Sequence, residues 1–321
     1  MTLGKVPDPI FMLRAHTTPV QSCRFVGEND SYILSGSIDG DVCLWNSMTK
    51  RIESNIKNIH KRGLLSVDQL NDTQIFSHGR DGMVYIYDIH KGLGFVNSSL
   101  ETGCFAYTQA RPIRQIQGTQ FSSCFTASSK EEGNISLYDP ISSSSSPVSF
   151  LFNKQKEGMV LASQLVESHS STYHLVSCTD AGNIIIHDVR NPNEYLCSLH
   201  ISESTLLSFD ITSSLNTIIC GGSSKQLFKL NIDLTNTSLS LLQTISIQGE
   251  GLGTIKIRND DKIVATGGWD TKIRLFQTKN MNPLAILHDH QSIVTCVDFS
   301  KYNDLISGSE DTKILFWNIY K

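Results

Sequence analysis

The stretch Leu305-Ile-Ser-Gly-Ser-Glu-Asp-Thr-Lys-Ile-Leu-Phe-Trp-Asn318 decides the fold, because its pattern recurs along the chain. Two other clear copies are Ile33-Leu-Ser-Gly-Ser-Ile-Asp-Gly-Asp-Val-Cys-Leu-Trp-Asn46 and Ile263-Val-Ala-Thr-Gly-Gly-Trp-Asp-Thr-Lys-Ile-Arg-Leu-Phe276. Each copy reads as an apolar run, a polar turn and a second apolar run that ends in an aromatic residue. Weaker copies occupy 75–88, 125–139, 175–188 and 218–231. The chain therefore carries seven repeats.

The repeat has the period of β-strands. Ile314 and Phe316 alternate with Lys313 and Leu315, a period of two residues. Further apolar runs precede most copies, at 20–25, 64–67, 159–165, 206–210, 253–257 and 293–299. The aromatic positions of successive copies lie 41 to 51 residues apart, close to the length of a four-stranded propeller blade. Since a lone blade cannot cover both its faces, blades stack around a channel.

These observations predict an all-β, seven-bladed β-propeller in which residues 1–321 form one domain. Only three residues follow Asn318, too few for the outer strand of the last blade. The apolar segment Pro9-Ile-Phe-Met-Leu13 precedes the first copy and has no other partner in this scheme. We therefore expect this N-terminal strand to complete the last blade and close the ring.

Composition excludes several other classes of protein. With 39% hydrophobic and 18% charged residues among 321, the chain can bury a core. A formal net charge of -4 gives no basic field for nucleic-acid phosphates, so no direct nucleic-acid partner is expected. No apolar run of membrane-spanning length occurs, and the eight scattered cysteines read as reduced core residues. We expect no membrane partner and a place in the nucleus or cytoplasm.

Three copies carry a histidine, a serine, an aspartate and an aromatic residue at similar spacing. A hydrolase triad would need one exposed serine at a strained turn beside an oxyanion hole. Recurrence with an aromatic partner instead favours structural networks that satisfy buried polar groups. We predict no catalytic residues, no metal ligands, no cofactor and no small-molecule substrate. The three sets are His16, Ser35, Asp39 and Trp45; His60, Ser77, Asp81 and Tyr87; and His290, Ser307, Asp311 and Trp317.

One turn position differs in character from copy to copy. It stands just before the turn aspartate, and we expect all seven residues to ring one mouth of the propeller. Trp and Arg are enriched at the energetic centres of interfaces, so Trp269 and Arg80 are predicted partner contacts, with Glu131, Asp180 and Glu310 as further candidates. The seven residues are Ile38, Arg80, Glu131, Asp180, Ser223, Trp269 and Glu310.

Three segments read as connections. The stretch from Gly92 to Thr119 and the serine run Ser142–Ser146 are predicted surface loops, with partner docking or phosphorylation as the alternative. The glycine-rich Gly249-Glu-Gly-Leu-Gly253 lacks the third glycine and following helix of a dinucleotide-binding loop. We interpret it as a flexible connection between blades.

The seven copies identify the chain as a WD-repeat protein from Pro9 to Trp317. More narrowly, the segments 8–20, 264–276 and 281–287 resemble the fungal ASTRA-associated WD-repeat proteins and their animal G-protein-β-subunit-like counterparts. This resemblance implies a nuclear and cytoplasmic scaffold subunit of the ASTRA assembly. Such a subunit is associated with chromatin regulation and with the Tel2-Tti complex that matures phosphatidylinositol-3-kinase-related kinases.

Two other classes of function remain as alternatives. A G-protein-like signalling β subunit would need a long N-terminal heptad helix, whereas eight residues precede Pro9. An enzyme acting in the propeller channel would need a convergent acid, base and metal set, which the sequence does not display.

Overall fold

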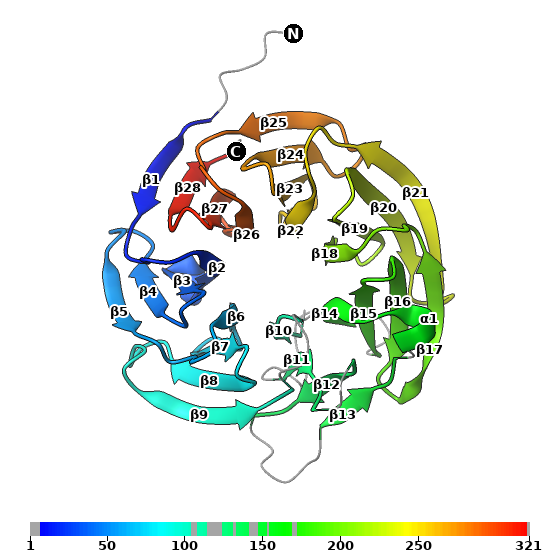
Figure 1. The fold of residues 1–321 in the computed structure, drawn as a ribbon, viewed down its shortest axis with the longest axis horizontal. Helices are drawn as coiled ribbons and strands as arrows, with labels where there is room; N and C mark the ends of the chain where they lie inside the picture. Colours follow the sequence, from blue (N-terminus) through cyan, green and yellow to red (C-terminus); the bar gives the residue numbers. More distant parts are fainter. Residues whose placement is uncertain are drawn as a thin grey trace.

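The computed structural model is a ring of four-stranded antiparallel sheets around a central channel (Figure 1). It describes residues 7–103, 108–113, 124–130, 133–140, 147–152, 154–168 and 172–319. Within these ranges, 28 strands form seven sheets, so the predicted seven-bladed propeller is confirmed. The single α-helix of these ranges, α1 (Lys154–Glu157), lies outside the blades, and none of their helices is long and apolar enough to cross a membrane.

The first four blades follow one another in chain order, each with its first strand at the channel and its last at the rim (Figure 1). Blade 1 comprises β2 (Val20–Val26), β3 (Tyr32–Ser37), β4 (Val42–Asn46) and β5 (Ile52–Ile56). Blade 2 comprises β6 (Leu64–Gln69), β7 (Gln74–Gly79), β8 (Met83–Asp88) and β9 (Val96–Glu101). Blade 3 comprises β10 (Arg111–Pro112), β11 (Phe125–Ser128), β12 (Ile135–Tyr138) and β13 (Val148–Phe150). Blade 4 comprises β14 (Val160–Glu167), β15 (Tyr173–Thr179), β16 (Asn183–Asp188) and β17 (Asn191–His200).

The remaining blades complete the ring. Blade 5 comprises β18 (Leu206–Ile211), β19 (Thr217–Gly222), β20 (Gln226–Asp233) and β21 (Ser238–Ser246). Blade 6 comprises β22 (Leu252–Ile257), β23 (Ile263–Gly268), β24 (Ile273–Gln277) and β25 (Pro283–Leu287). Blade 7 comprises β26 (Val294–Phe299), β27 (Asp304–Ser309) and β28 (Ile314–Asn318), with β1 (Pro9–Leu13) as its outer strand.

Blade 7 therefore joins the two ends of the chain, as the sequence predicts. Strand β1 pairs antiparallel with β28, with Phe11 opposite Phe316 and Leu13 opposite Ile314. The neighbouring blade 1 contacts blade 7 at the thiols of Cys23 and Cys296, whose sulfur atoms lie 3.2 Å apart. The first and last repeats are thus held by a strand ladder and by packing between blades.

The alternation within each copy distributes its side chains between two cores. Val42 and Leu44 of β4 face blade 2, where they pack with Leu64. Cys43 and Trp45 of the same strand belong to the core shared with blade 7. Both faces of the strand are buried because each blade is covered by a neighbour on either side.

Two of the predicted polar networks form as expected. In blade 7, His290 Nδ1 donates to Asp311 Oδ2 at 3.0 Å, and its Nε2 lies 2.8 Å from Ser307 Oγ. Trp317 Nε1 donates to the same hydroxyl at 2.9 Å. In blade 2, His60 makes the equivalent contacts with Asp81 at 3.1 Å and Ser77 at 2.8 Å, and Tyr87 OH completes the set; its members are His60, Ser77, Asp81 and Tyr87.

The prediction for blade 1 is wrong in one member. His16 Nε2 lies 2.8 Å from Ser35 Oγ, and Trp45 Nε1 donates to that hydroxyl, but Asp39 is exposed. Among the described residues, His16 Nδ1 has no hydrogen-bond partner. The carboxylate held in this region is Asp41, which accepts from the backbone N–H of Asn58 at 2.9 Å.

Blade 6 holds its turn aspartate with an arginine instead of a histidine. Arg274 Nη1 donates to Asp270 Oδ1 at 3.0 Å, and Nη2 donates to Oδ2 at 2.6 Å. This fork-to-carboxylate pair holds the turn aspartate without a histidine. Nη2 also donates to the backbone carbonyl of Gln248. The sequence analysis missed this pair, whose signal is an arginine four residues after the turn aspartate.

The segment from Gly92 to Thr119 is not a plain surface loop. It contains the outer strand β9 of blade 2 and the inner strand β10 of blade 3, so the loop prediction is wrong there. These strands escaped detection because β9 is mostly exposed and polar and β10 has two residues. The serine run Ser142–Ser146 lies outside the described residues. The seven described cysteines are free thiols, and all except the half-buried Cys197 are buried.

Deletion of residues 1–13 is expected to remove β1 and leave the edge of β28 unpaired. The truncated protein should aggregate or lose much of its melting temperature, measured by circular dichroism and light scattering. Deletion of residues 1–7 retains the whole of β1 and is the matched control. A 1–13 deletion as stable as this control would contradict the closure of the ring by β1.

Substitution of His290 or Asp311 by alanine should each lower the free energy of unfolding by about 1 to 3 kcal/mol, because each leaves buried partners unsatisfied. The double variant should lose less than the sum, since both residues belong to one network. Urea titrations measure these losses. Asp39→Ala is the control and should cost little, because that carboxylate is exposed. Additive losses would argue against a shared network.

Acid should destabilise the fold through its buried histidines. Burial lowers the pKa of His16 and of His187 to about 4, and that of His78 to about 3. Below the ordinary pKa of about 6.5, the unfolded chain binds these protons while the folded chain does not, so stability falls as the pH falls toward 4. Urea titrations from pH 7 to 4 should show this slope. His187→Phe should reduce the proton uptake on unfolding by about one; an unchanged slope would contradict this assignment.

Candidate functional site

The turns between the second and third strands of the blades share one backbone geometry. At the described turn positions equivalent to Trp269, the N–H donates to the carbonyl of a residue shortly before the first strand of the same blade. Trp269 N donates to Gly251 O at 3.1 Å, and Arg80 N donates to Gly63 O at 2.9 Å. The same bond holds the others, which are Ile38, Asp180, Ser223 and Glu310. These six residues are structurally equivalent and lie on one face of the ring, here called the turn face; Glu131 lies outside the described residues.

Trp269 is half-buried on the turn face, with its ring over the connection between blades 5 and 6. Gly251 has a φ of 139°, and a Cβ built on it would lie 2.9 Å from Trp269 Cε3. Only glycine leaves room for the indole at this point. The predicted connection between blades is confirmed at residues 249–251, whereas Leu252 and Gly253 already belong to strand β22. Gly251 supports the tryptophan.

The other turn residues give this face a mixed character. Ile38 is 38% exposed, and Glu310 is exposed with its carboxylate accepting from Ser292 Oγ at 3.1 Å. Asp180 is half-buried and accepts the backbone N–H of Met159 at 2.7 Å. Arg80 and Ser223 are half-buried. The turn face thus combines apolar and charged side chains, as protein interfaces do.

The inner strands carry a second set of equivalent residues, which the sequence analysis missed. Each residue of this set pairs with a residue of the second strand of its blade. That partner lies one position after the residue opposite the aromatic position, as Leu34 does for Arg24 and Ile306 for Asp298. The signal is a polar residue near the end of each channel-lining strand. In ring order the set, here called the channel ring, is Arg24, Asp68, Arg111, Gln164, Asp210, Lys256 and Asp298.

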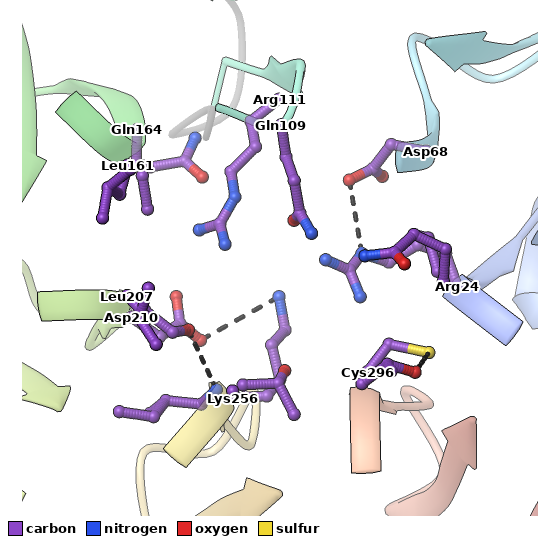
Figure 2. Close-up of a pocket in the computed structure, with 18 residues that line it drawn as sticks. Arg24, Asp68, Gln109, Arg111, Leu161, Gln164, Leu207, Asp210, Lys256 and Cys296 are labelled. Atoms are coloured by element: carbon purple, nitrogen blue, oxygen red, sulfur yellow. Dashed lines mark hydrogen bonds and ion pairs between the residues drawn. The ribbon is translucent and has the colours of Figure 1, made fainter. Parts of the chain in front are cut away.

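Charges alternate around the channel ring, and neighbours form ion pairs (Figure 2). Arg24 Nε lies 3.4 Å from Asp68 Oδ2. Lys256 Nζ lies 3.9 Å from Asp210 Oδ2 and 3.8 Å from Asp298 Oδ1. Seven positions cannot alternate perfectly, and the neutral Gln164 occupies the place where two like charges would otherwise meet.

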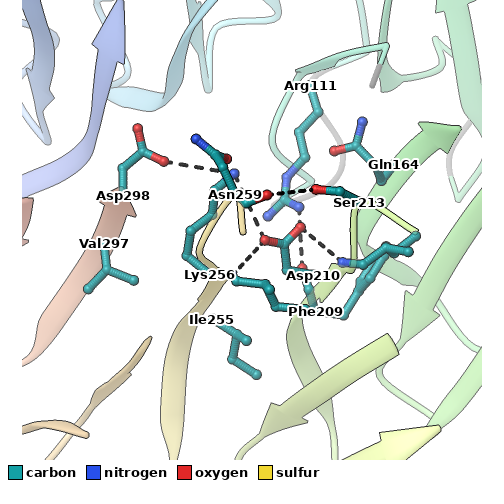
Figure 3. Close-up of polar contacts among 12 residues, drawn as sticks. Arg111, Gln164, Phe209, Asp210, Ser213, Ile255, Lys256, Asn259, Val297 and Asp298 are labelled. Atoms are coloured by element: carbon teal, nitrogen blue, oxygen red, sulfur yellow. Dashed lines mark hydrogen bonds and ion pairs between the residues drawn. The ribbon is translucent and has the colours of Figure 1, made fainter. Parts of the chain in front are cut away.

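Channel-ring residues also link neighbouring blades. Asp298 Oδ2 accepts the backbone N–H of Phe25 in blade 1 at 2.9 Å. Asp210 Oδ2 accepts the N–H of Ile257 in blade 6 at 2.8 Å (Figure 3). Burial raises the pKa of the Asp298 carboxyl, although Lys256 and Arg24 oppose this shift. These carboxylates therefore stabilise the joints between blades.

The channel encloses a cavity of about 200 Å³ lined by every member of the channel ring except Asp298, and also by Gln21, Gln109 and Cys296. Among the described residues, no group of three or more His, Cys, Asp or Glu side chains could hold a metal ion. The histidine sets lie within the blades, where His60 and His290 are held by buried serines. The turn face is therefore the candidate surface for protein partners.

Comparison with known proteins agrees with this architecture. The family model described as "WD domain, G-beta repeat" matches residues 7–46 and 281–318. A solved structure, the β-propeller domain of Cps50 (Swd1) from Myceliophteria thermophila, superposes with a TM-score of 0.80 at 16% identity. It covers 98% of this chain and 100% of that one, and at this identity the likeness shows the fold alone.

Relatives extend over the whole length of the chain. The mouse guanine nucleotide-binding protein subunit beta-like protein 1 is 26% identical, with 98% of this chain and 97% of that protein covered. ASTRA-associated protein 1 of Schizosaccharomyces pombe is 22% identical, and that of Schizosaccharomyces japonicus is 20% identical, each covering 98% of this chain and 100% of its own length. The chain is thus a seven-bladed propeller with WD40 repeats that resembles ASTRA-associated protein 1 from end to end.

Proposed function

We propose that this chain is a non-catalytic scaffold subunit of an ASTRA-type assembly, acting in chromatin regulation and in the Tel2-Tti-linked maturation of phosphatidylinositol-3-kinase-related kinases. WD-repeat propellers generally serve as protein-interaction scaffolds, and the fold and the repeats of this chain support that general role. The proposed membership in an ASTRA-type assembly rests on the similarity to ASTRA-associated protein 1, which extends around the entire ring. A nuclear location, with a cytoplasmic pool, belongs to the same proposal.

The turn face is the proposed contact surface. In the channel ring, Arg24 pairs with Asp68 and Lys256 with Asp210, and in blade 7 His290 pairs with Asp311, so these groups already have partners within the protein. On the turn face, Trp269 presents a supported aromatic surface with Ile38 and Glu310 on the same face. A rigid aromatic residue loses little side-chain entropy on binding, which favours its use at an interface.

Trp269→Ala should weaken the binding of the Tel2-Tti and ASTRA proteins by about thirtyfold, equivalent to about 2 kcal/mol. The measurement is affinity capture from cells of the source organism, with partners identified by mass and affinities then measured on purified proteins. Arg80→Ala should act in the same direction. Because Trp269 is half-buried, each variant's melting temperature must be measured, and binding compared where the protein remains folded.

Met48→Ala is the matched control. Met48 is 87% exposed and lies in the connection between β4 and β5, at the opposite end of the blade from the turn face. It should leave capture unchanged. Failure of the wild-type chain to capture these proteins would contradict the proposed assembly, whereas equal capture by wild type and Trp269→Ala would exclude only the turn face.

A further inference from the structure

Arg111 is the one member of the channel ring whose charge is not paired within the described part of the chain. On one side of Arg111 in the ring, Asp68 pairs with Arg24. On the other side lies the neutral Gln164, and beyond it Asp210 binds Lys256 and the N–H of Ile257. No carboxylate oxygen of the described residues lies within 4.0 Å of the Arg111 guanidinium. One cation of the channel ring, Arg111, therefore has no carboxylate partner among the described residues.

Within the described part of the chain, Arg111 uses few of its hydrogen-bond donors. A guanidinium has five N–H donors, and here Nη1 makes one long bond, 3.4 Å, to the carbonyl of Phe209. The Phe209 ring centroid lies 6.0 Å from the guanidinium carbon. Nε is buried and has no hydrogen-bond partner among the described residues.

Such a cation is unfavourable unless an anion joins it. Burial and the nearby Arg24 lower the pKa of Arg111, although Asp210 and Asp68 oppose this shift. Removing a charge from water costs free energy that only a counter-charge with good hydrogen bonds restores. A guanidinium with free, coplanar donors is suited to two oxygen atoms of a phosphate or a carboxylate.

The space in front of Arg111 can accept such a group. The guanidinium points into the channel beside the amide of Gln109, with Gln164 on the adjoining blade (Figure 2). Gln164 Nε2 already donates to the carbonyl of Pro112 at 2.8 Å, whereas Gln109 forms no hydrogen bond with the described residues. The cavity of about 200 Å³ has room for one small oxyanion with its water.

We propose that the channel is an oxyanion-binding site in which Arg111, assisted by Gln109, holds one phosphate or carboxylate group. The group enters as a free phosphate ion or as an acidic side chain of a bound peptide. Asp68 is next to Arg111 in the ring, and Asp210 follows Gln164 on the other side. Their charges limit the site to a single anionic group and make its occupancy sensitive to salt.

Isothermal titration of the full chain in phosphate-free buffer tests this site, with inorganic phosphate in one arm and an acetylated hexaglutamate peptide in the other. Sodium chloride holds the ionic strength constant. At least one probe should bind with a Kd on the order of 1 mM or tighter. Arg111→Gln should weaken that binding at least tenfold, and Arg51→Gln, which alters an exposed arginine of blade 1, should not.

The two arms distinguish the source of the anion. Phosphate binding alone indicates a free ion, and peptide binding that phosphate competes away indicates an acidic side chain; either result supports the site. Absence of binding by both probes overturns it, as does binding that persists in Arg111→Gln. If Arg111→Gln does not fold, Arg111→Lys replaces it as the test variant. Lysine keeps the positive charge but lacks the paired, coplanar donors of the guanidinium, so binding should weaken at least threefold. Unchanged affinity in Arg111→Lys overturns the proposal.

Discussion

Closure of the ring depends on the pairing of β1 with β28. Every blade needs a neighbour on both faces, because the inner strands bury side chains on each side. A ring built in strict chain order would join its first and last blades by side-chain packing alone. Sharing blade 7 between the two ends of the chain adds backbone hydrogen bonds to that joint. Opening the ring then requires breaking a strand ladder, so closure is cooperative with the folding of blade 7.

The channel imposes a second constraint, which is electrostatic. Seven equivalent positions converge in a narrow space, where like charges would repel strongly. Alternating cations and carboxylates remove that repulsion, and the carboxylates also accept backbone N–H groups from the next blade. Because seven is odd, one neutral residue is needed, and Gln164 supplies it. The same imbalance places Arg111 beside the neutral Gln164, and no carboxylate of the described residues pairs with it.

Structural and interaction roles occupy different parts of the blade. The buried histidine sets hold the turns from beneath, so their loss would act on stability. The residues at the tips of the turns, including Trp269, are exposed or half-buried and vary from blade to blade. A repeated framework with variable tips allows one rigid ring to present several different contacts on a single face.

The repeat pattern by itself determined the number of blades, the strand period, the closing strand and two of the three complete polar networks. These features are local or periodic, since each depends on residues a fixed distance apart in the chain. Tertiary structure alone decided the rest. Asp39 matches the pattern of Asp311 yet is exposed, because the contacts of its turn differ. The Arg274–Asp270 pair lies within one hairpin of blade 6, and the exposed strand β9 and the two-residue strand β10 lack a clear apolar period, so the repeat pattern did not reveal them. The channel ring depends on which side chains meet across blades, and residues as far apart as Phe25 and Asp298 meet only when the ring closes.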